Sequence, residues 1–163
     1  MDIHKLTKLS LELLEKRKHL GNLKYNHMCV IITKKGIPLS YGYNDYDYKN
    51  NITEHAEEMA IRKYINKINL LKTYKKKIGY LFVIRTNGNN SKPCSNCINI
   101  IDKYSYIITI KNIYYTHEEE ESGIRKTTIK QLIDGPQHIS QYQQNCIKPF
   151  SVIHAIKPIY SVG

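Results

Sequence analysis

The sequences T-E-H-A-E-E-M-A at residues 53–60, Y-L-F-V-I at residues 80–84 and P-C-S-N-C at residues 93–97 decide the fold that we expect. The first predicts a helix over 54–68, because Thr53 is a favourable N-cap and acidic residues follow at the positive end of the helix dipole. The second has the continuous apolar character of a buried central strand. The third begins another helix with a proline and places both cysteines in its first turn. The chain therefore predicts two helix starts with a strand between them.

Further elements are predicted on both sides of this unit. An amphipathic helix over 3–18 precedes it, and the polar, tyrosine-rich stretch 44–51 predicts a loop. The predicted strands are the apolar or alternating runs 28–33, 39–43, 80–84, 112–116 and 124–129. The first two are joined by Lys34-Lys35-Gly36, a sequence typical of a β-hairpin, and the last two by the acidic turn 118–123. We predict no element after Gly135.

The composition is that of one globular domain spanning residues 1–163. Apolar residues make up 41% of the chain, which is long enough to bury a core without disulfides. No run of eighteen apolar residues occurs, so we expect neither a membrane span nor a secretory leader. Two of the four cysteines have a metal-type spacing, which favours a reducing, cytoplasmic setting over a disulfide-bonded, secreted protein.

The chain is strongly basic, with 25 Lys and Arg residues against 14 Asp and Glu residues and a net charge of +11. Such a balance attracts phosphate-bearing partners, so nucleic acid or nucleotides are conceivable. The lysines are scattered, however, and Ile, Asn and Tyr are also abundant, which is the composition that A/T-rich codons of a virus or similar genome produce. We favour this compositional explanation, because scattered charges usually form a solvated surface.

His55, Cys94 and Cys97 are the candidate metal ligands. Two cysteines at positions i and i+3 of a helix face the same way, so their sulfur atoms can hold one ion, and a helix N-terminus favours their thiolates. With His55 they give three zinc ligands and leave the fourth position to a water molecule, which zinc acidifies toward neutral pH. Glu57 is not needed as a ligand, and its carboxylate is placed to move protons between that water and a substrate.

Each of these patterns also has a structural interpretation. His-x-Glu alone is usually a surface pair, and Cys-x-x-Cys alone is found in redox dithiols and structural zinc knuckles. A structural zinc site needs a fourth protein ligand, for which the chain offers His27, Cys29, His117 and Cys146. We favour the catalytic interpretation, because the whole pattern lies on two predicted helix starts with a strand between them.

The sequence H-A-E on one helix and P-C-x-x-C on the next, with a hairpin before and a strand between, resembles the zinc-dependent cytidine and deoxycytidylate deaminase superfamily over about residues 29–116. The resemblance implies a three-layer α/β/α sandwich with a mixed five-stranded sheet, and hydrolytic deamination of a cytosine or adenine base. It implies one zinc per chain, held by His55, Cys94 and Cys97, with Glu57 as general acid and base. Relatives often assemble as homo-oligomers, which we expect here too.

Two further features bear on the substrate. Asn44 ends the second predicted strand in Y-G-Y-N and resembles the asparagine with which many members hold the sugar; an asparagine that only ends a strand and starts a loop explains it equally well. The predicted return of the chain after residues 118–123 is similar to the final hairpin of the free-nucleoside branch. Against that branch, His55 stands where its members usually have cysteine, and residues 98–100 lack the small or basic residues typical of named branches.

Three functions remain open from the sequence. We favour conversion of a cytosine-type nucleoside or nucleotide to the uracil form, with release of ammonia, in pyrimidine salvage. The second is deamination of tRNA or single-stranded DNA, in which basic residues bind phosphates and the tyrosines within 41–48 stack on bases. The third is a catalytically inert, deaminase-like zinc-binding module. Glu57 argues against the third, because a structural zinc site has no need of this acid.

Overall fold

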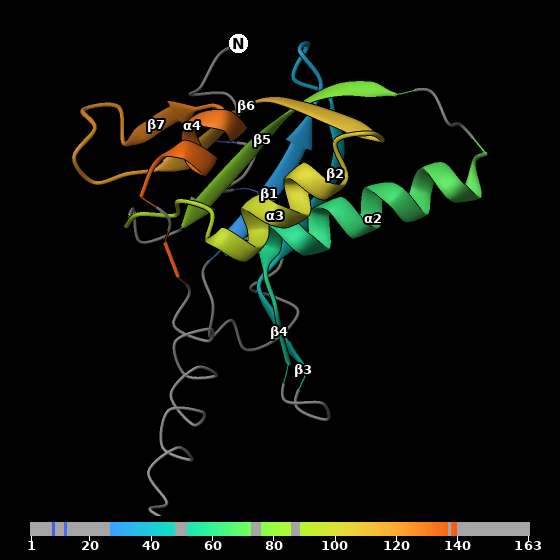
Figure 1. Ribbon diagram of the computed structural model, residues 1–163, viewed down its shortest axis with the longest axis horizontal. Coiled ribbons are helices and arrows are strands. Elements are labelled where there is room, and N and C mark those ends of the chain that lie inside the picture. The colour runs from blue at the N-terminus through green and yellow to red at the C-terminus, as the bar shows by residue number, and fades with distance from the viewer. Residues whose placement is uncertain are drawn as a thin grey trace, which may run out of the picture.

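A mixed five-stranded sheet forms the centre of the protein (Figure 1). The computed structural model describes residues 8, 12, 27–47, 52–72, 76–85, 89–136 and 138–139. The strand order is β2-β1-β5-β6-β7. The strands are β1 (His27–Ile32), β2 (Pro38–Tyr43), β5 (Lys77–Arg85), β6 (Ile108–Thr116) and β7 (Ile124–Thr127). The five predicted strands are therefore present, and the predicted α/β class with a mixed five-stranded sheet is confirmed.

Strand directions follow from the connections between the strands. β1 pairs antiparallel with both β2 and β5, and the first of these pairs is the hairpin expected from Lys34-Lys35-Gly36. β5 and β6 are parallel, because helix α3 (Ser95–Lys103) returns the chain to the same end of the sheet. β7 then pairs antiparallel with β6 across the acidic turn, as predicted. The C-terminal ends of β5 and β6 consequently meet at one end of the sheet.

Three described helices lie on one face of the sheet: α2 (Ala56–Leu70), α3 and α4 (Ile129–Asp134) (Figure 1). Alternate residues of the strands point toward them and form one buried cluster with their apolar faces. This cluster includes Cys29, Ile31, Ala56, Ala60, Tyr64, Leu81, Val83, Ile98, Ile101, Ile113 and Leu132. The helices are therefore fixed on the sheet by burial of their apolar sides. None of the described helices is long and apolar enough to span a membrane.

The opposite face of the sheet is also apolar and buried. Its side chains come from the intervening strand positions: Met28, Val30, Ile32, Tyr80, Phe82, Ile84, Tyr114 and Ile124. Of the helix predicted over 3–18, the structure describes Lys8 and Glu12, which are both helical and exposed. The remainder of that prediction lies outside the described residues.

The stretch 44–51, which we expected to be a loop, contains strand structure. β3 (Asp45–Asp47) and β4 (Ile52–Glu54) pair antiparallel and form a narrow ribbon that projects below the sheet in Figure 1. Thr53 pairs with Tyr46 in this ribbon and is held extended, so it is not the N-cap that we predicted. His55 takes that position instead, and helix α2 begins at Ala56.

Helix α4 is an element that we did not predict. The sequence 124–129 was expected to be one strand, but β7 ends at Thr127 and the helix starts at Ile129. Thr128 and Gln131 form a capping box, in which each side chain accepts a hydrogen bond from the other residue's backbone amide. This Thr-x-x-Gln pattern is a helix-start signal that outweighs the alternation of the preceding residues.

The start of α2 approaches strand β2 very closely at Gly42. A Cβ atom at this position would lie 2.2 Å from the carbonyl oxygen of Ala56 and 2.5 Å from the amide nitrogen of Ala60. Only glycine permits this approach, because the atoms that a side chain would meet belong to the helix backbone. Gly42 therefore sets the distance between β2 and the helix whose N-terminus carries His55.

Replacing Gly42 by alanine is expected to lower the free energy of unfolding by about 3 kcal/mol, since the backbone of α2 must move away from the strand. Gly79→Ala is the matched control. Its added Cβ would lie 2.9 Å from Cδ1 of Ile108, the tip of a side chain that can rotate away. We expect this control to lose about 1 kcal/mol or less. Denaturant unfolding at equal zinc content measures both variants, and equal losses would contradict the role given to Gly42.

Candidate functional site

His55, Cys94 and Cys97 come together at the end of the sheet where β5 terminates. Nδ1 of His55 lies 3.3 Å from Sγ of Cys97 and 3.4 Å from Sγ of Cys94. The donor atoms of all three residues lie within 4.8 Å of one another, and both cysteines are buried. One imidazole nitrogen and two sulfur atoms at this spacing suit a single zinc ion. The predicted donor set therefore fits the metal that the sequence implies.

Helix geometry brings these donors together. His55 is the N-cap of α2, and its carbonyl accepts a hydrogen bond from the amide of Met59 at 3.0 Å. Cys94 is the N-cap of α3, and its carbonyl accepts a hydrogen bond from the amide of Ile98 at 2.9 Å. Cys97 follows in the first turn of α3, as the spacing predicted. Two helix N-termini thus converge on the cluster, and their partial positive charges favour thiolate sulfur.

A buried serine anchors the loop that carries Cys94. The hydroxyl of Ser91 donates to the carbonyl of Val83 at 2.9 Å and accepts from the amide of Thr116, also at 2.9 Å. The amide of Ser91 donates to the carbonyl of Thr116 at 3.0 Å. Ser91 therefore joins the ends of β5 and β6 just before the metal ligands. The role of Ser91 as a cross-strand anchor has no signal in the sequence.

The pKa values of the two cysteines shift in opposite directions. Hydrogen bonds from Cys97 and His55 lower the pKa of the Cys94 thiol to about 4. The same pairing with Cys94, together with burial, raises the pKa of Cys97 well above its usual value. The hydrogen bond to Cys94 also raises the pKa of His55. Zinc binding would displace the protons that its donors carry.

Glu57 lies beside the cluster but is not part of it. Glu57 is only 5% exposed. Burial is the main reason that the pKa of Glu57 rises to about 6. Glu57 is thus a buried acid outside the group that could hold the metal, and its role as a proton carrier stays a prediction.

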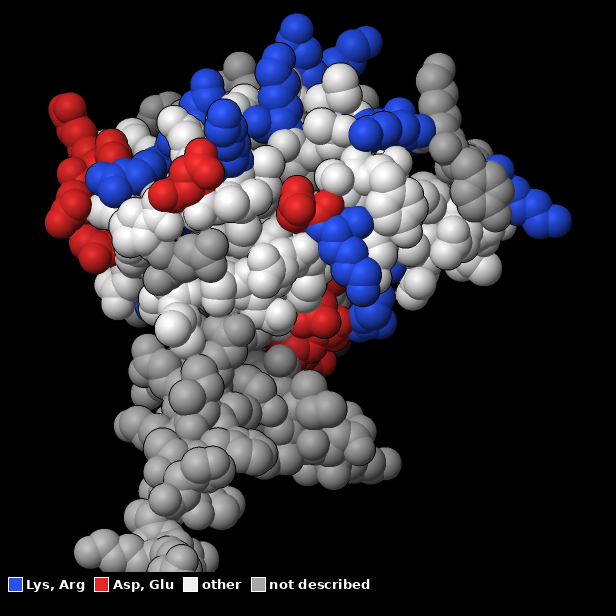
Figure 2. All heavy atoms as spheres, viewed as in Figure 1, with Lys and Arg blue, Asp and Glu red and all other residues white. Residues whose placement is uncertain are grey.

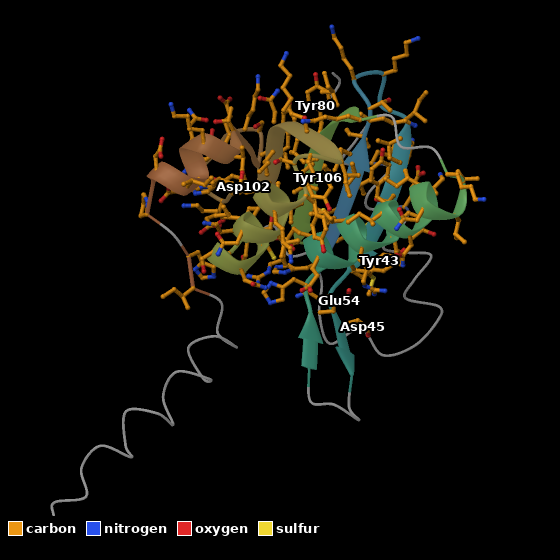
Figure 3. All side chains as sticks on the ribbon, turned by 45° about the vertical axis from the view of Figure 1, so that its right-hand side comes forward. Tyr43, Asp45, Glu54, Tyr80, Asp102 and Tyr106 are labelled. Carbon is orange, nitrogen blue, oxygen red and sulfur yellow. The ribbon has the colours of Figure 1, made fainter. Side chains whose placement is uncertain are left out.

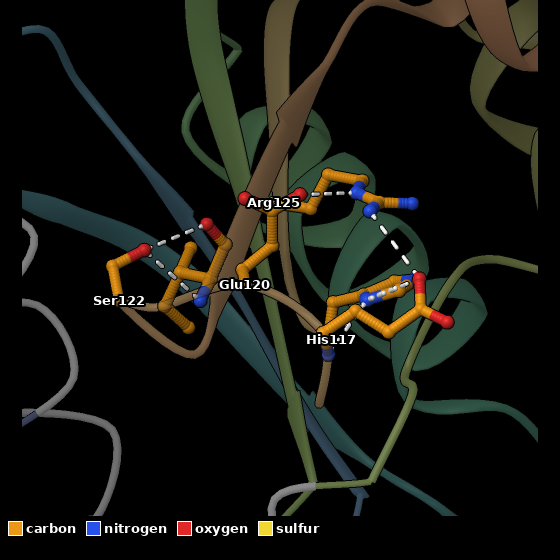
Figure 4. A network of polar contacts seen from close by, with 6 residues as sticks. His117, Glu120, Ser122 and Arg125 are labelled. Atoms are coloured by element: carbon orange, nitrogen blue, oxygen red, sulfur yellow. Dashed lines mark hydrogen bonds and ion pairs between the residues drawn. The ribbon is translucent and has the colours of Figure 1, made fainter.

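Among the described residues, no fourth ligand joins the three donors. His27, Cys29 and His117, which we had considered for a structural zinc site, all lie outside the cluster. His117 instead supports the turn between β6 and β7, where its amide donates to the carbonyl of Gly123 at 2.9 Å. Its Nδ1 atom also lies 3.3 Å from the backbone amide of Glu119 in the same turn (Figure 4). The fourth candidate, Cys146, lies outside the described residues.

Asn44 has a visible structural role. Its Oδ1 atom accepts a hydrogen bond from the amide of Ala56 at 2.9 Å, which satisfies the first free N–H of helix α2. Its Nδ2 atom lies 3.3 Å from Nδ1 of His27. Asn44 thus fixes the start of α2 next to His55, and its contact with a substrate sugar stays a prediction.

One group of exposed lysines on the described surface lies away from the cluster. Figure 2 shows Lys and Arg gathered at the end of the molecule where the β1–β2 turn and the start of β5 lie, and exposed lysines there include Lys34, Lys35, Lys76 and Lys77. In Figure 3, Tyr80 lies toward that same end, and Asp45 and Glu54 lie at the opposite end. Glu54 directly precedes His55 in the sequence. These lysines therefore do not line the candidate site.

Tyr41 and Tyr43 contact each other and Lys63. Their rings meet edge to face with centroids 5.7 Å apart, and Nζ of Lys63 lies 5.3 Å from the centre of the Tyr41 ring and 5.7 Å from that of Tyr43. These contacts join the edge strand β2 to helix α2. The side chains of Tyr46 and Tyr48, the other tyrosines expected to stack on bases, lie outside the described residues.

A profile of the family described as "Cytidine and deoxycytidylate deaminase zinc-binding region" matches residues 2–116. The chain belongs to this family. The match covers both helix starts and the strand between them, so it includes His55, Glu57, Cys94 and Cys97. The resemblance inferred from the sequence is thereby confirmed, and the site is that of a zinc-binding deaminase domain.

A solved structure of a deaminase has the same fold. Cytidine deaminase from Burkholderia pseudomallei aligns with a TM-score of 0.55 at 16% identity, over 83% of this chain and 100% of that one. The dCMP deaminase of the cyanophage S-TIM5 aligns with a TM-score of 0.47 at 19% identity, over 74% of this chain and 88% of that one. No curated protein sequence matches the chain. The first alignment shows that the chain has the cytidine deaminase fold.

Removing either sulfur ligand should remove the metal. We expect Cys94→Ala and Cys97→Ala to bind less than about a tenth of the zinc that the unaltered protein binds, because two protein donors hold zinc poorly. Cys29→Ala is the matched control, since Cys29 is also fully buried but lies outside the cluster. Elemental analysis after dialysis gives the zinc content per chain. Full zinc content in either ligand variant would mean that the ligands are wrongly assigned.

Proposed function

We propose that this deaminase converts a cytosine-type nucleoside or nucleotide to the uracil form by hydrolysis. His55, Cys94 and Cys97 are the zinc ligands, and Glu57 is the general acid and base. The observation that carries the proposal is the buried carboxyl of Glu57 beside three converging metal donors. A structural zinc site has no use for such a group, and burying it costs stability. Membership of the deaminase family supports the reaction class.

The reaction replaces the amino group at C4 of the base by an oxygen atom from water. Zinc supplies Lewis-acid activation of the attacking water when it is bound. Glu57 accepts one proton of this water and delivers it to the ring nitrogen next to C4, which makes the carbon susceptible to attack. Glu57 then transfers the second proton to the amino group, which leaves as ammonia. The carboxyl is unchanged at the end, as a catalyst requires.

Burial of Glu57 serves this proton transfer in two ways. A carboxyl shielded from bulk water does not lose its proton to the solvent between the two steps. Its place in the first turn of α2, two residues after His55, also fixes its distance from the metal donors through the helix backbone. The same residues therefore set both the position of the metal and the position of the proton carrier.

The exposed lysines at the far end of the sheet give no support to a polynucleotide substrate, so we favour a small one. The exposed lysines of the β1–β2 turn and the start of β5 lie at the far end of the sheet from the cluster. A strand of tRNA or DNA with its target base at the zinc would need basic groups around the site opening. We place the reaction in pyrimidine salvage. Assembly into a homo-oligomer remains a prediction, which the mass of the protein in solution tests.

Glu57→Gln separates catalysis from metal binding. We expect this variant to keep its zinc and its thermal stability while its kcat falls by a factor of about a hundred to ten thousand, because the amide cannot carry protons. Ammonia release from cytidine, deoxycytidine, their monophosphates and a cytosine-containing single-stranded oligonucleotide is the measurement. Unchanged turnover in the variant would exclude the role of Glu57. No turnover by the unaltered zinc-loaded protein on any of these compounds would favour the inert module.

A further inference from the structure

Among the described residues, no carboxylate is paired with the guanidinium of Arg85, which lies at the end of β5 that leads to the metal ligands. Arg85 is the last residue of β5 and is half-buried. Its Nε atom donates a hydrogen bond to Nε2 of His27, and its backbone amide donates to Oγ1 of Thr116 at 3.2 Å. Each of the other two arginines that the structure describes is paired with a carboxylate. Arg62 is paired with Glu54 at 2.7 Å, and Arg125 is paired with Glu120 at 2.6 Å.

Arg85 and His27 lie on the same side of the sheet as the metal cluster. The two residues pair directly across β5 and β1. Because side chains alternate along a strand, Arg85 shares a face with Val83, and His27 shares a face with Cys29. Val83 and Cys29 both belong to the buried cluster beneath α2 and α3. The guanidinium therefore lies on the helix-bearing face, at the end of β5 that leads to the metal ligands.

Around His27, the N–H groups that can donate a hydrogen bond outnumber the ring nitrogens that can accept one. The amide of Ala56 fixes Oδ1 of Asn44, so Nδ2 of Asn44 is the atom that faces Nδ1 of His27. Nε of Arg85 faces the other ring nitrogen. A neutral imidazole accepts a hydrogen bond at one nitrogen, and a protonated one accepts at neither. At least one N–H of this group consequently needs an acceptor that comes from elsewhere.

We propose that Arg85 binds the 5′-phosphate of a cytidine or deoxycytidine monophosphate, with His27 as the positioning residue. This inference rests on the proposed function and names the substrate class of the same site. His27 holds Nε of Arg85, which leaves the two terminal amino groups of the guanidinium free of acceptors from the described part of the chain. Such a fork matches two phosphate oxygens. A phosphate dianion also supplies the opposite charge that a half-buried guanidinium requires.

The position of Asn44 connects this phosphate site to the metal. Asn44 contacts His27 with one side-chain atom and the first residue of α2, which follows His55, with the other. The chain of contacts from Arg85 through His27 and Asn44 thus ends beside a metal ligand. A nucleotide with its base at the zinc and its phosphate at Arg85 would lie along this chain of contacts. An uncharged nucleoside would leave the guanidinium without its partner.

Comparison of nucleotides with nucleosides tests the proposal in the zinc-loaded protein. The unaltered enzyme should prefer dCMP to deoxycytidine. Arg85→Gln should lower kcat/KM for dCMP and CMP about tenfold to a hundredfold, mainly through KM, and change that for deoxycytidine and cytidine less than about twofold. Arg125→Gln is the matched control, because it removes the same charge from a guanidinium already paired with Glu120. It should leave the preference unchanged.

The outcomes separate this inference from the proposed function. Equal losses for nucleotides and nucleosides in Arg85→Gln would overturn the phosphate site while leaving the deaminase activity in place. Preference for the single-stranded oligonucleotide over dCMP would overturn a monophosphate as the substrate. If none of these compounds is deaminated, calorimetric titration of the zinc-loaded protein with dCMP and with deoxycytidine still tests the phosphate site. Tighter binding of dCMP than of deoxycytidine, lost in Arg85→Gln, supports the site, and equal binding refutes it.

Discussion

The convergence of two helix N-termini at one end of the sheet is the constraint on which the site depends. α2 begins after His55 and α3 begins after Cys94, so the residues that cap the two helices are also metal donors. Two positive helix ends placed together repel each other unless negative groups lie between them. The Cys94 thiolate and, above its pKa, the Glu57 carboxylate are such groups. Metal chemistry and helix electrostatics therefore require the same residues at this place.

The convergence is held by contacts between segments that are distant in sequence. Ser91 joins the ends of β5 and β6 in front of Cys94. Asn44 holds the first amide of α2, and Gly42 lets the helix backbone approach β2 closely. None of these residues would touch the metal. They set the separation and the direction of the helices. Zinc binding needs donor atoms at fixed positions, and a shift of either helix by a fraction of an ångström would change the distances between them.

The sequence was sufficient for the parts of the fold that repeat a local pattern. The apolar run 80–84, the hairpin turn 34–36 and the Cys-x-x-Cys spacing each determine structure within a few residues, and the structure contains what they predict. The ribbon of β3 and β4 was missed, because its polar and tyrosine-rich residues have no apolar alternation. Helix α4 was missed although its capping box is present in the sequence, because we gave more weight to the alternation before it.

The same distinction applies to the site: residues recognised by a local pattern could be predicted, and residues whose role depends on packing could not. The metal donors and Glu57 could be named from the sequence, since their chemistry and spacing are local. Asn44 was singled out for a sugar, and its contact with Ala56 depends on packing of the ribbon and helix that the sequence does not reveal. Arg85 carried no signal at all. Its pairing with His27 depends on the register of β1 against β5, and a shift of one residue would turn both side chains to the other face.

Net charge and local charge have separate consequences in this protein. The charge of +11 gives a field that attracts any anion, but salt screens it over a distance of about 8 Å in physiological solution. The exposed lysines at the far end of the sheet therefore contribute to the rate at which an anionic substrate arrives and little to its placement at the zinc.

Placement of the substrate at the zinc needs a charge that is partly shielded from water and fixed in direction. Among the described arginines, Arg85 meets both conditions, because burial reduces its screening and His27 fixes its orientation. The many scattered lysines can thus follow from genome composition without weakening the case for one specific cation at the site.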